Sequence, residues 1–307
     1  MNEIFNQELS PMLFYESDVF DSQDYIYELK FDGIRCLAYL EENKTTLINK
    51  RQKELSSTYP ELSKIHKQVN KPCIVDGEIV IMNNGKPDFY QLQKRSLMAN
   101  SLKIKLQAAK LPVIFVAFDI LYLDDKLTID LPLLERKQLL QSNLIENPRI
   151  VISRYIDGHG SDFFELTKKQ QLEGIVAKEK TSKYYPGKRS RVWLKIKVYQ
   201  EDHLIICGYL PKENGIKELI LGSYDDNNNI YKVASVVTSK DQQVIINFAN
   251  QHPSTSIFDL DNNDIIWMEP YLVGRVRYMM KTKSGGLRQP VFVGVCSDKT
   301  AEDLTRH

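Results

Sequence analysis

One lysine stands at the end of an apolar strand pattern, beside a carboxylate, a glycine and an arginine. It is Lys30, in the run ELKFDGIR of residues 28–35. A solvated lysine is a protonated ammonium, and it becomes a nucleophile only where burial or a neighbouring cation lowers its pKa. Apolar residues alternate on both sides, which predicts two half-buried strands with a turn at Asp32-Gly33. K-x-D-G alone is more often a hairpin with a solvated lysine. With the residues described next, we expect Lys30 at a hairpin corner, placed to attack phosphorus.

Chemistry on nucleotide phosphates also requires a divalent metal, which in turn requires acidic side chains at strand ends. Glu78 lies in the apolar strand pattern 75–80, and Glu173 directly precedes the pattern 174–178. Each alone is more often a solvated turn carboxylate. Together with Lys30 they form a set, and we expect both to serve Mg²⁺ or Mn²⁺.

Basic residues concentrate between positions 178 and 197. Lys195 and Lys197 alternate with apolar residues, so they share one face of a strand. The segment contains only one acid and is the clearest polyphosphate-binding footprint of the chain; its cations are Lys178, Lys180, Lys183, Lys188, Arg189, Arg191, Lys195 and Lys197.

Two arginines and one aromatic residue complete the candidate site. Arg35 and Arg51 suit phosphates because guanidinium binds them bidentately. Phe118 lies in a buried strand pattern and offers a ring for a base, although a lone phenylalanine there is more often core.

Composition limits the class of protein. The 307 residues are 42% apolar, enough for one large and one small domain, and the net charge of +1 implies neither a polyanion nor a membrane surface as partner. The four cysteines are far apart without metal-ligand spacing, which is typical of free thiols in a reducing cytosol. The N-terminus has no signal-peptide pattern, and the apolar run 111–123 is too short to span a bilayer. We expect a cytoplasmic protein with no membrane association.

The order of strand and helix patterns predicts an α+β domain followed by a small barrel. Strand patterns lie at 25–30, 34–40, 45–49, 73–82, 111–122, 149–155, 174–178 and 191–198, and helical patterns lie near 88–110, 132–142 and 161–171. Ser161 is the expected N-cap of the last helix. Beyond Lys197, strand patterns at 204–209, 218–224, 231–237, 265–267 and 289–295 surround one helical segment, 240–250. That pattern predicts an OB-fold barrel, with domains at 1–200 and 201–307.

Several motifs, in this order, resemble those of ATP-dependent DNA ligases. They are KFDGIR (30–35), VDGE (75–78), FDILYL (118–123), EGIVAK (173–178) and WLKIK (193–197). TYPEL (58–62), YYPGKRS (184–190), CGY (207–209) and GLRQPVF (286–292) are similar to the ligase domain of bacterial end-joining (ligase D-type) DNA ligases. The resemblance implies a nucleotidyltransferase domain of ATP-grasp-like antiparallel sheets with helices, followed by an OB-fold domain.

The resemblance also implies roles for the residues. Lys30 would attack the α-phosphate of ATP, release pyrophosphate and hold AMP as a phosphoramidate. Glu28 and Phe118 would contact adenosine, and Glu78 and Glu173 would bind the metal. The phosphates would be bound by Arg35, Arg51, Lys195 and Lys197. Lys178 of EGIVAK would lie beside the nucleotide, and Asp32 is a secondary candidate. In the barrel, Arg288 and Lys299 resemble the family's last motif, which orients pyrophosphate.

AMP would then pass to the 5′-phosphate of a nick or break in double-stranded DNA, and the 3′-hydroxyl would displace it. We expect a monomer, with a DNA-end-binding protein as a candidate partner. The sequence before Lys30 is too short for the helical DNA-binding domain of larger ligases, so the two catalytic domains or a partner should hold the DNA.

Three alternatives remain. The nearest is another covalent nucleotidyltransferase on the same scaffold, an RNA ligase or a capping guanylyltransferase, which shares K-x-D-G. From a different class comes a non-catalytic DNA-binding module, and the third is a Schiff-base role for Lys30, for which the sequence contains no supporting cofactor pattern. The EGIVAK and WLKIK motifs and the segment 288–299 favour a DNA ligase. The chain departs from the family pattern at Lys53 and Asp125, where glycine is usual, and at residues 232–237, where the family has a more glycine-rich barrel turn.

Overall fold

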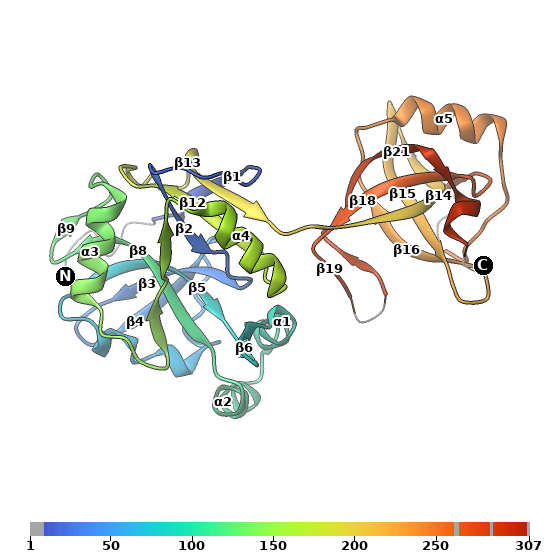
Figure 1. Cartoon of the computed structure of the whole chain (residues 1–307). Coiled ribbons are helices and arrows are strands. Elements are labelled where there is room, and N and C mark those ends of the chain that lie inside the picture. Colours follow the sequence, from blue (N-terminus) through green and yellow to red (C-terminus); the bar gives the residue numbers. More distant parts are fainter. Residues whose placement is uncertain (1–8, 261–263, 283–284, 306–307) are drawn as a thin grey trace. The chain divides into compact units, whose positions relative to one another are not determined.

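The structure, a computed structural model, describes residues 9–260, 264–282 and 285–305 (Figure 1). The chain divides into two compact units, Met1–Val198 and Tyr199–His307. The first consists of two sheets with outer helices, and the second is a smaller, mostly β unit. The α+β class predicted from the alternating patterns is confirmed.

The first unit contains two mixed sheets. The first sheet consists, in spatial order, of β1 (Leu13–Glu16), β13 (Arg189–Lys197), β12 (Gly174–Glu179), β2 (Tyr25–Leu29) and β11 (Tyr155–Asp157). The second sheet consists of β10 (Ile150–Ile152), β8 (Ile114–Leu123), β5 (Cys73–Val80), β3 (Ile34–Leu40) and β4 (Thr45–Asn49), with β9 (Lys126–Leu127) paired to β8. The pairs β1–β13 and β10–β8 are parallel and the other pairs are antiparallel.

The predicted hairpin around Lys30 is wrong. Its two strands form as expected, but β2 pairs with β11 and β12 in the first sheet, while β3 pairs with β4 and β5 in the second. Residues 30–33 therefore link two sheets. Gly33 is required here because a Cβ would lie 2.3 Å from the backbone oxygen of Ile79. Alternation identifies a strand, but its partner is chosen by tertiary packing.

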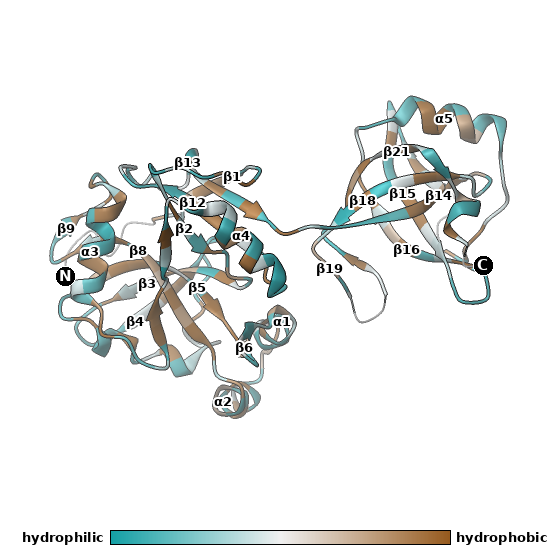
Figure 2. Cartoon of the chain, in the orientation of Figure 1, coloured by the Kyte–Doolittle hydropathy of each residue, from teal (hydrophilic) through white to brown (hydrophobic). Residues whose placement is uncertain are grey.

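An apolar core joins the two sheets. Ile26 and Trp193 of the first sheet lie in one buried cluster with Leu37, Ile74 and Leu121 of the second. A separate cluster covers the other face of the second sheet. In Figure 2 the hydrophobic colour is concentrated on its central strands, as expected for a sheet that is buried on both faces.

Helices cover the outside of the first unit. They are α1 (Phe89–Ser96), α2 (Ser101–Lys110), α3 (Leu133–Asn143) and α4 (Gly160–Lys169), with short 3₁₀ turns at Pro60–Leu62 and Ile65–Gln68 and the two-residue strands β6 (Met82–Asn83) and β7 (Lys86–Pro87). The single helical pattern 88–110 is two helices: α1 ends at Ser96, and Asn100 caps α2 by accepting a hydrogen bond from the Lys103 N–H. The prediction of Ser161 as an N-cap is wrong: α4 begins at Gly160, and the Ser161 N–H donates to Asp21.

The turn after β8 forms without the usual glycine. Asp124 and Asp125 adopt left-handed backbone angles, with φ of +48° and +67°. The Tyr122 hydroxyl donates a 2.8 Å hydrogen bond to Asp125 Oδ1. Aspartate tolerates this conformation better than most residues, so the departure at Asp125 leaves the turn intact.

The second unit is built on five longer strands. In spatial order they are β16 (Ile230–Val236), β15 (Gly215–Tyr224), β14 (Gln200–Lys212), β18 (Leu272–Tyr278) and β21 (Val291–Thr300); β17 (Ile266–Trp267), the pair β19 (Met280–Lys281) and β20 (Leu287–Arg288), α5 (Gln242–Gln251) and the 3₁₀ turn Ala301–Leu304 complete the unit. The patterns missed β18 because Gly274 occupies one of its buried positions, so the apolar alternation is too short to mark a strand. The predicted strand 265–267 is only a two-residue addition to β14.

The cysteines form no disulfide bonds. All four are free thiols; Cys36, Cys73 and Cys207 are buried and Cys296 is half-buried. Burial raises the pKa of both Cys73 and Cys207 to about 12, so these two thiols are inert packing residues.

Within the described part of the chain, no helix has both the length and the apolar character needed to cross a membrane.

Candidate active site

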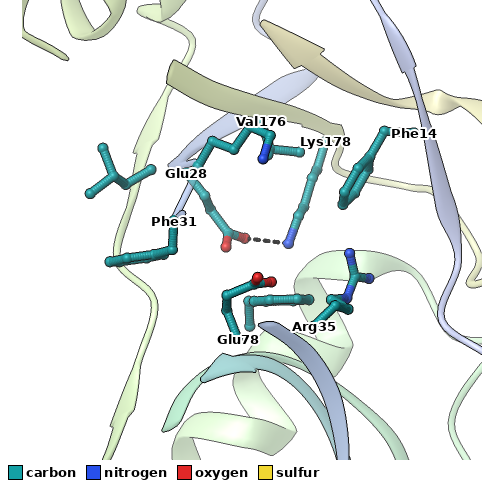
Figure 3. Close-up of a pocket in the computed structure, with 10 residues that line it drawn as sticks. Phe14, Glu28, Phe31, Arg35, Glu78, Val176 and Lys178 are labelled. Carbon is teal, nitrogen blue, oxygen red and sulfur yellow. Dashed lines mark ion pairs between the residues drawn. The ribbon is translucent and has the colours of Figure 1, made fainter. Parts of the chain in front are cut away.

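A pocket between the two sheets gathers several of the predicted residues. It is lined by Phe14, Glu28, Leu29, Lys30, Phe31, Arg35, Glu78, Phe118, Val176 and Lys178 (Figure 3). These residues come from β1, β2, β12, β3, β5 and β8 and from the link that carries Lys30. Residues from KFDGIR, VDGE, FDILYL and EGIVAK therefore meet in one place.

Lys30 is held at both its backbone and its side chain. Its N–H donates a 2.9 Å hydrogen bond to the Gly174 carbonyl, and its Nζ lies 2.7 Å from Glu173 Oε1. The Lys30 side chain is 19% exposed and that of Glu173 only 7%. An amine in this position is constrained by an ion pair and still reachable from the pocket.

Glu173 has one carboxylate oxygen that forms no hydrogen bond. Burial raises its pKa, although Lys30 opposes that shift. Its Oε2 is buried without a hydrogen-bond partner. A buried carboxylate oxygen without a partner costs free energy, and a cation placed there would recover it.

Glu78 lines the pocket together with Glu28, whereas Glu173 is not one of the lining residues and contacts one of them, Lys30. Glu78 lies opposite Arg35 in the β3–β5 pairing. Burial raises its pKa to about 8, Arg35 and Lys30 act against this rise, and the charge of Glu173 adds to it. Two crowded carboxylates fit a divalent cation that is held by one or two acids, water and substrate phosphates, as Mg²⁺ commonly is. Among the residues that the structure describes, no cluster of three or more His, Cys, Asp or Glu side chains could hold a metal alone.

Arg35 forms an ion pair with the buried carboxylate of Asp76. Its Nε and Nη2 donate to Asp76 at 2.7 and 2.6 Å, and the Tyr184 hydroxyl donates to Asp76 at 2.6 Å. Burial alone would lower the Arg35 pKa, but Asp76 raises it. Arg35 therefore lies in the pocket wall with two donors occupied, and only its remaining edge can serve a phosphate.

Glu28 lies among the pocket residues with two lysines bound to it. Lys178 Nζ is 3.0 Å from its Oε1, the contact drawn dashed in Figure 3, and Lys137 of α3 binds the same oxygen. Burial raises the Glu28 pKa, but Lys137 and Lys178 lower it, and the net shift is downward. Burial lowers the Lys178 pKa to about 8.

The rings of the pocket are associated with cations. Arg35 and Lys178 lie 4.5 and 4.4 Å from the Phe118 ring centroid, and Lys178 also lies 4.3 Å from that of Trp193. Phe118 is only 8% exposed. Phe14 and Phe31 contribute further rings to the lining. Phe118 is thus both a core residue and a pocket wall.

Other predicted residues lie outside this lining. Lys195 pairs with Glu16 at 3.1 Å, and burial lowers the pKa of Lys197, which is paired with Gly174 across β12 and β13. Asp32 adds to the rise in the Glu173 pKa. Arg51 is exposed beyond the end of β4.

Arg288 and Lys299 belong to the second unit. Arg288 lies in β20 opposite Met280 of β19, and Lys299 lies in β21. Their approach to ATP stays a prediction from the resemblance.

Sequence reasoning missed several residues around the pocket. Asp76 lies within β5 and Phe31 in the link after β2, and both lie inside the quoted motifs, which was a usable signal. Phe14 and Lys137 lie in no motif, and only the packing of β1 and α3 brings them to the site. Tyr184 was read as part of a basic segment, whereas it is buried against Asp76.

Comparison with known proteins agrees with the geometry. The family model of the ATP dependent DNA ligase domain matches residues 11–197, and the model of the ATP dependent DNA ligase C terminal region matches residues 212–299. The chain is 31% identical over 286 residues to the SPbeta prophage-derived DNA ligase-like protein LigB of Bacillus subtilis, covering 92% of this chain and 97% of that protein. It is 28% identical to the multifunctional non-homologous end joining protein LigD of Mycolicibacterium smegmatis over 97% of this chain, and spans 40% of that longer protein.

Solved structures show the same fold. The crystal structure of the ligase domain of M. tuberculosis LigD matches with a TM-score of 0.57 and 25% identity, covering 97% of this chain and 98% of that one. A mycobacterial DNA ligase D complexed with ATP and MES matches with a TM-score of 0.58, 25% identity and the same coverage. Since one family model alone covers more than half of the sequence, the chain belongs to the ATP-dependent DNA ligase family and is an enzyme that joins DNA ends.

Proposed function

We propose that Lys30 is the nucleophile that forms a covalent lysyl-AMP. The observation that carries this proposal is the Lys30 amine, 2.7 Å from Glu173 and lining one pocket with Glu28, Glu78 and Lys178. The amine attacks the α-phosphorus of ATP, the bond from phosphorus to the bridging oxygen breaks, and pyrophosphate leaves. Attack requires the lone pair, so the amine gives up its proton, for which the adjacent Glu173 carboxylate is the nearest acceptor.

We assign the metal to Glu78 and Glu173. The unpartnered Oε2 of Glu173 and the raised pKa of Glu78 both fit a bound divalent cation, Mg²⁺ or Mn²⁺. Such a cation would neutralise charge on the phosphates and the leaving group.

The remaining residues bind and orient the nucleotide. Glu28 and the pocket rings contact adenosine, Lys178 lies beside the base, and Lys195, Lys197 and the free edge of Arg35 face the phosphates. Arg51 is a further phosphate ligand, and Arg288 and Lys299 of the second unit orient the pyrophosphate. Positioned cations of this kind stabilise charge that develops during phosphoryl transfer.

The DNA steps follow from the same chemistry. AMP passes from Lys30 to the 5′-phosphate at a nick or break in double-stranded DNA, and the 3′-hydroxyl then displaces AMP and seals the strand. A role in DNA repair, a monomeric state, a cytoplasmic location and recruitment by a DNA-end-binding protein are further proposals, supported by the LigD ligase-domain relatives.

Lys30→Ala tests this function. The variant should take up no label from α-labelled ATP and should seal no nick when given ATP, yet retain sealing of a nick that already carries AMP. Lys126→Ala, at an exposed lysine in β9, is the matched control and should behave as wild type. Undiminished labelling of Lys30→Ala would refute the assignment.

A further inference from the structure

Lys137 of α3 contacts Glu28, one of the residues that line the pocket, although α3 contains none of the quoted motifs. Its Nζ binds Glu28 Oε1, and its side chain is only 5% exposed. Lys178 binds the same oxygen at 3.0 Å and is 2% exposed. One buried carboxylate thus receives two buried ammonium groups, where one would balance its charge.

The neighbouring residue fixes where Lys137 lies. Arg136 donates from Nε and Nη2 to Asp119 of β8 at 2.8 and 2.9 Å, and both side chains are fully buried. It also donates to the Ser182 carbonyl at 2.8 Å. These bonds hold α3 against β8, so the next residue along the helix meets Glu28 in a fixed geometry.

We propose that Lys137 is a positioning residue that holds the Glu28 carboxylate in place and thereby makes the pocket select ATP over GTP. The inference rests on the proposed contact between Glu28 and the base. An ionised carboxylate only accepts hydrogen bonds. Adenine offers an amino group at the position where guanine has a carbonyl, so a fixed carboxylate accepts the first and repels the second.

The charges around Glu28 support this role. Burial raises its pKa, and Lys137 is the largest influence that lowers it, followed by Lys178. Lys137 of α3 and Lys178 of β12 bind Glu28 directly. Tyr155 of β11 is its register partner on the neighbouring strand, and the other titratable groups of the pocket lining are Lys30, Arg35 and Glu78. Without Lys137 the pKa rises, and a protonated Glu28 would donate to the guanine carbonyl.

The experiment compares lysyl-AMP and lysyl-GMP formation by full-length Lys137→Met. Losing a buried charged contact should lower the ATP-to-GTP selectivity by about tenfold, through a higher KM for ATP more than a lower kcat. The loss should deepen as pH falls from about 8 to about 5. Lys137→Arg should restore most of the selectivity, and Gln138→Met, at an exposed neighbour on α3, should leave it unchanged.

A double-mutant cycle separates positioning from a general structural effect. In a Glu28→Gln background, Lys137→Met should cause no further loss of selectivity. Equal slowing with both nucleotides, or wild-type selectivity at every pH, would overturn the proposal. If Lys137→Met is unfolded by circular dichroism, the wild-type pH profile decides: constant selectivity down to about pH 5 supports the proposal, and a falling ATP preference contradicts it. Absence of lysyl-AMP in the wild type would instead refute the proposed function.

Discussion

Replacing Asp76 with asparagine should destabilise the first unit strongly. The Asp76 side chain is fully buried and accepts three hydrogen bonds, two from Arg35 and one from Tyr184, between 2.6 and 2.7 Å. Asparagine keeps the shape but leaves the Arg35 guanidinium, which is 10% exposed, without its counter-charge. Breaking a buried pair in this way costs about 3–5 kcal/mol. For a unit of this size, that loss lowers the Tm by roughly 10 °C.

The two tryptophans make the measurement specific to that unit. Trp193 is buried in the first unit beside Tyr184, with ring centroids 5.6 Å apart, whereas Trp267 lies in the second. In a Trp267→Phe background, Trp193 fluorescence during urea unfolding therefore reports on the first unit alone. Asp130→Asn, which removes the exposed 3.1 Å pair with Lys183, is the control and should leave the midpoint unchanged. A wild-type urea midpoint for Asp76→Asn would refute the conclusion that Asp76 holds Arg35.

Three further predictions concern the site, the second unit and DNA. Folding raises the Glu78 pKa from 4.5 to about 8. Between these pH values the folded state retains a proton that the unfolded state has lost, so the free energy of unfolding should fall as pH rises through this window. Urea midpoints measured without metal should show this fall, and Glu78→Gln should abolish it. Arg288→Ala should slow adenylation by ATP about 10²- to 10³-fold in single-turnover labelling while sparing the sealing of pre-adenylated nicks, and equal loss of both steps would contradict its role with pyrophosphate. Arg191→Gln should reduce the slope of log binding constant for DNA against log salt concentration by about 1 without changing adenylation. An unchanged slope in a filter-binding titration would show that Arg191 does not contact DNA phosphates.

Local patterns predicted most strands, because alternation directly reflects which face is buried. They failed where pairing depends on distant residues: β2 and β3 were expected as a hairpin, yet each finds its partners in a different sheet. β18 was missed because Gly274, which has no apolar side chain, occupies one of its buried positions and shortens the alternation.

In the candidate site, too, some residues could be identified from local sequence and others depend on distant packing. Motif residues such as Lys30, Glu78 and Lys178 could be named from the sequence because the chemistry demands their types. Lys137 could not, since nothing in α3 indicates that it meets Glu28 across the fold. The ion pair between Arg35 and Asp76 could not be predicted either, because it depends on the register of β3 and β5.

The most direct test of the central claim is to locate AMP on the protein. After incubation with ATP and Mg²⁺, the intact protein should gain the mass of one AMP, and fragmentation of its peptides should place that mass on Lys30. An adduct on any other residue, or no adduct in a protein that still seals nicks with ATP, would contradict the assignment.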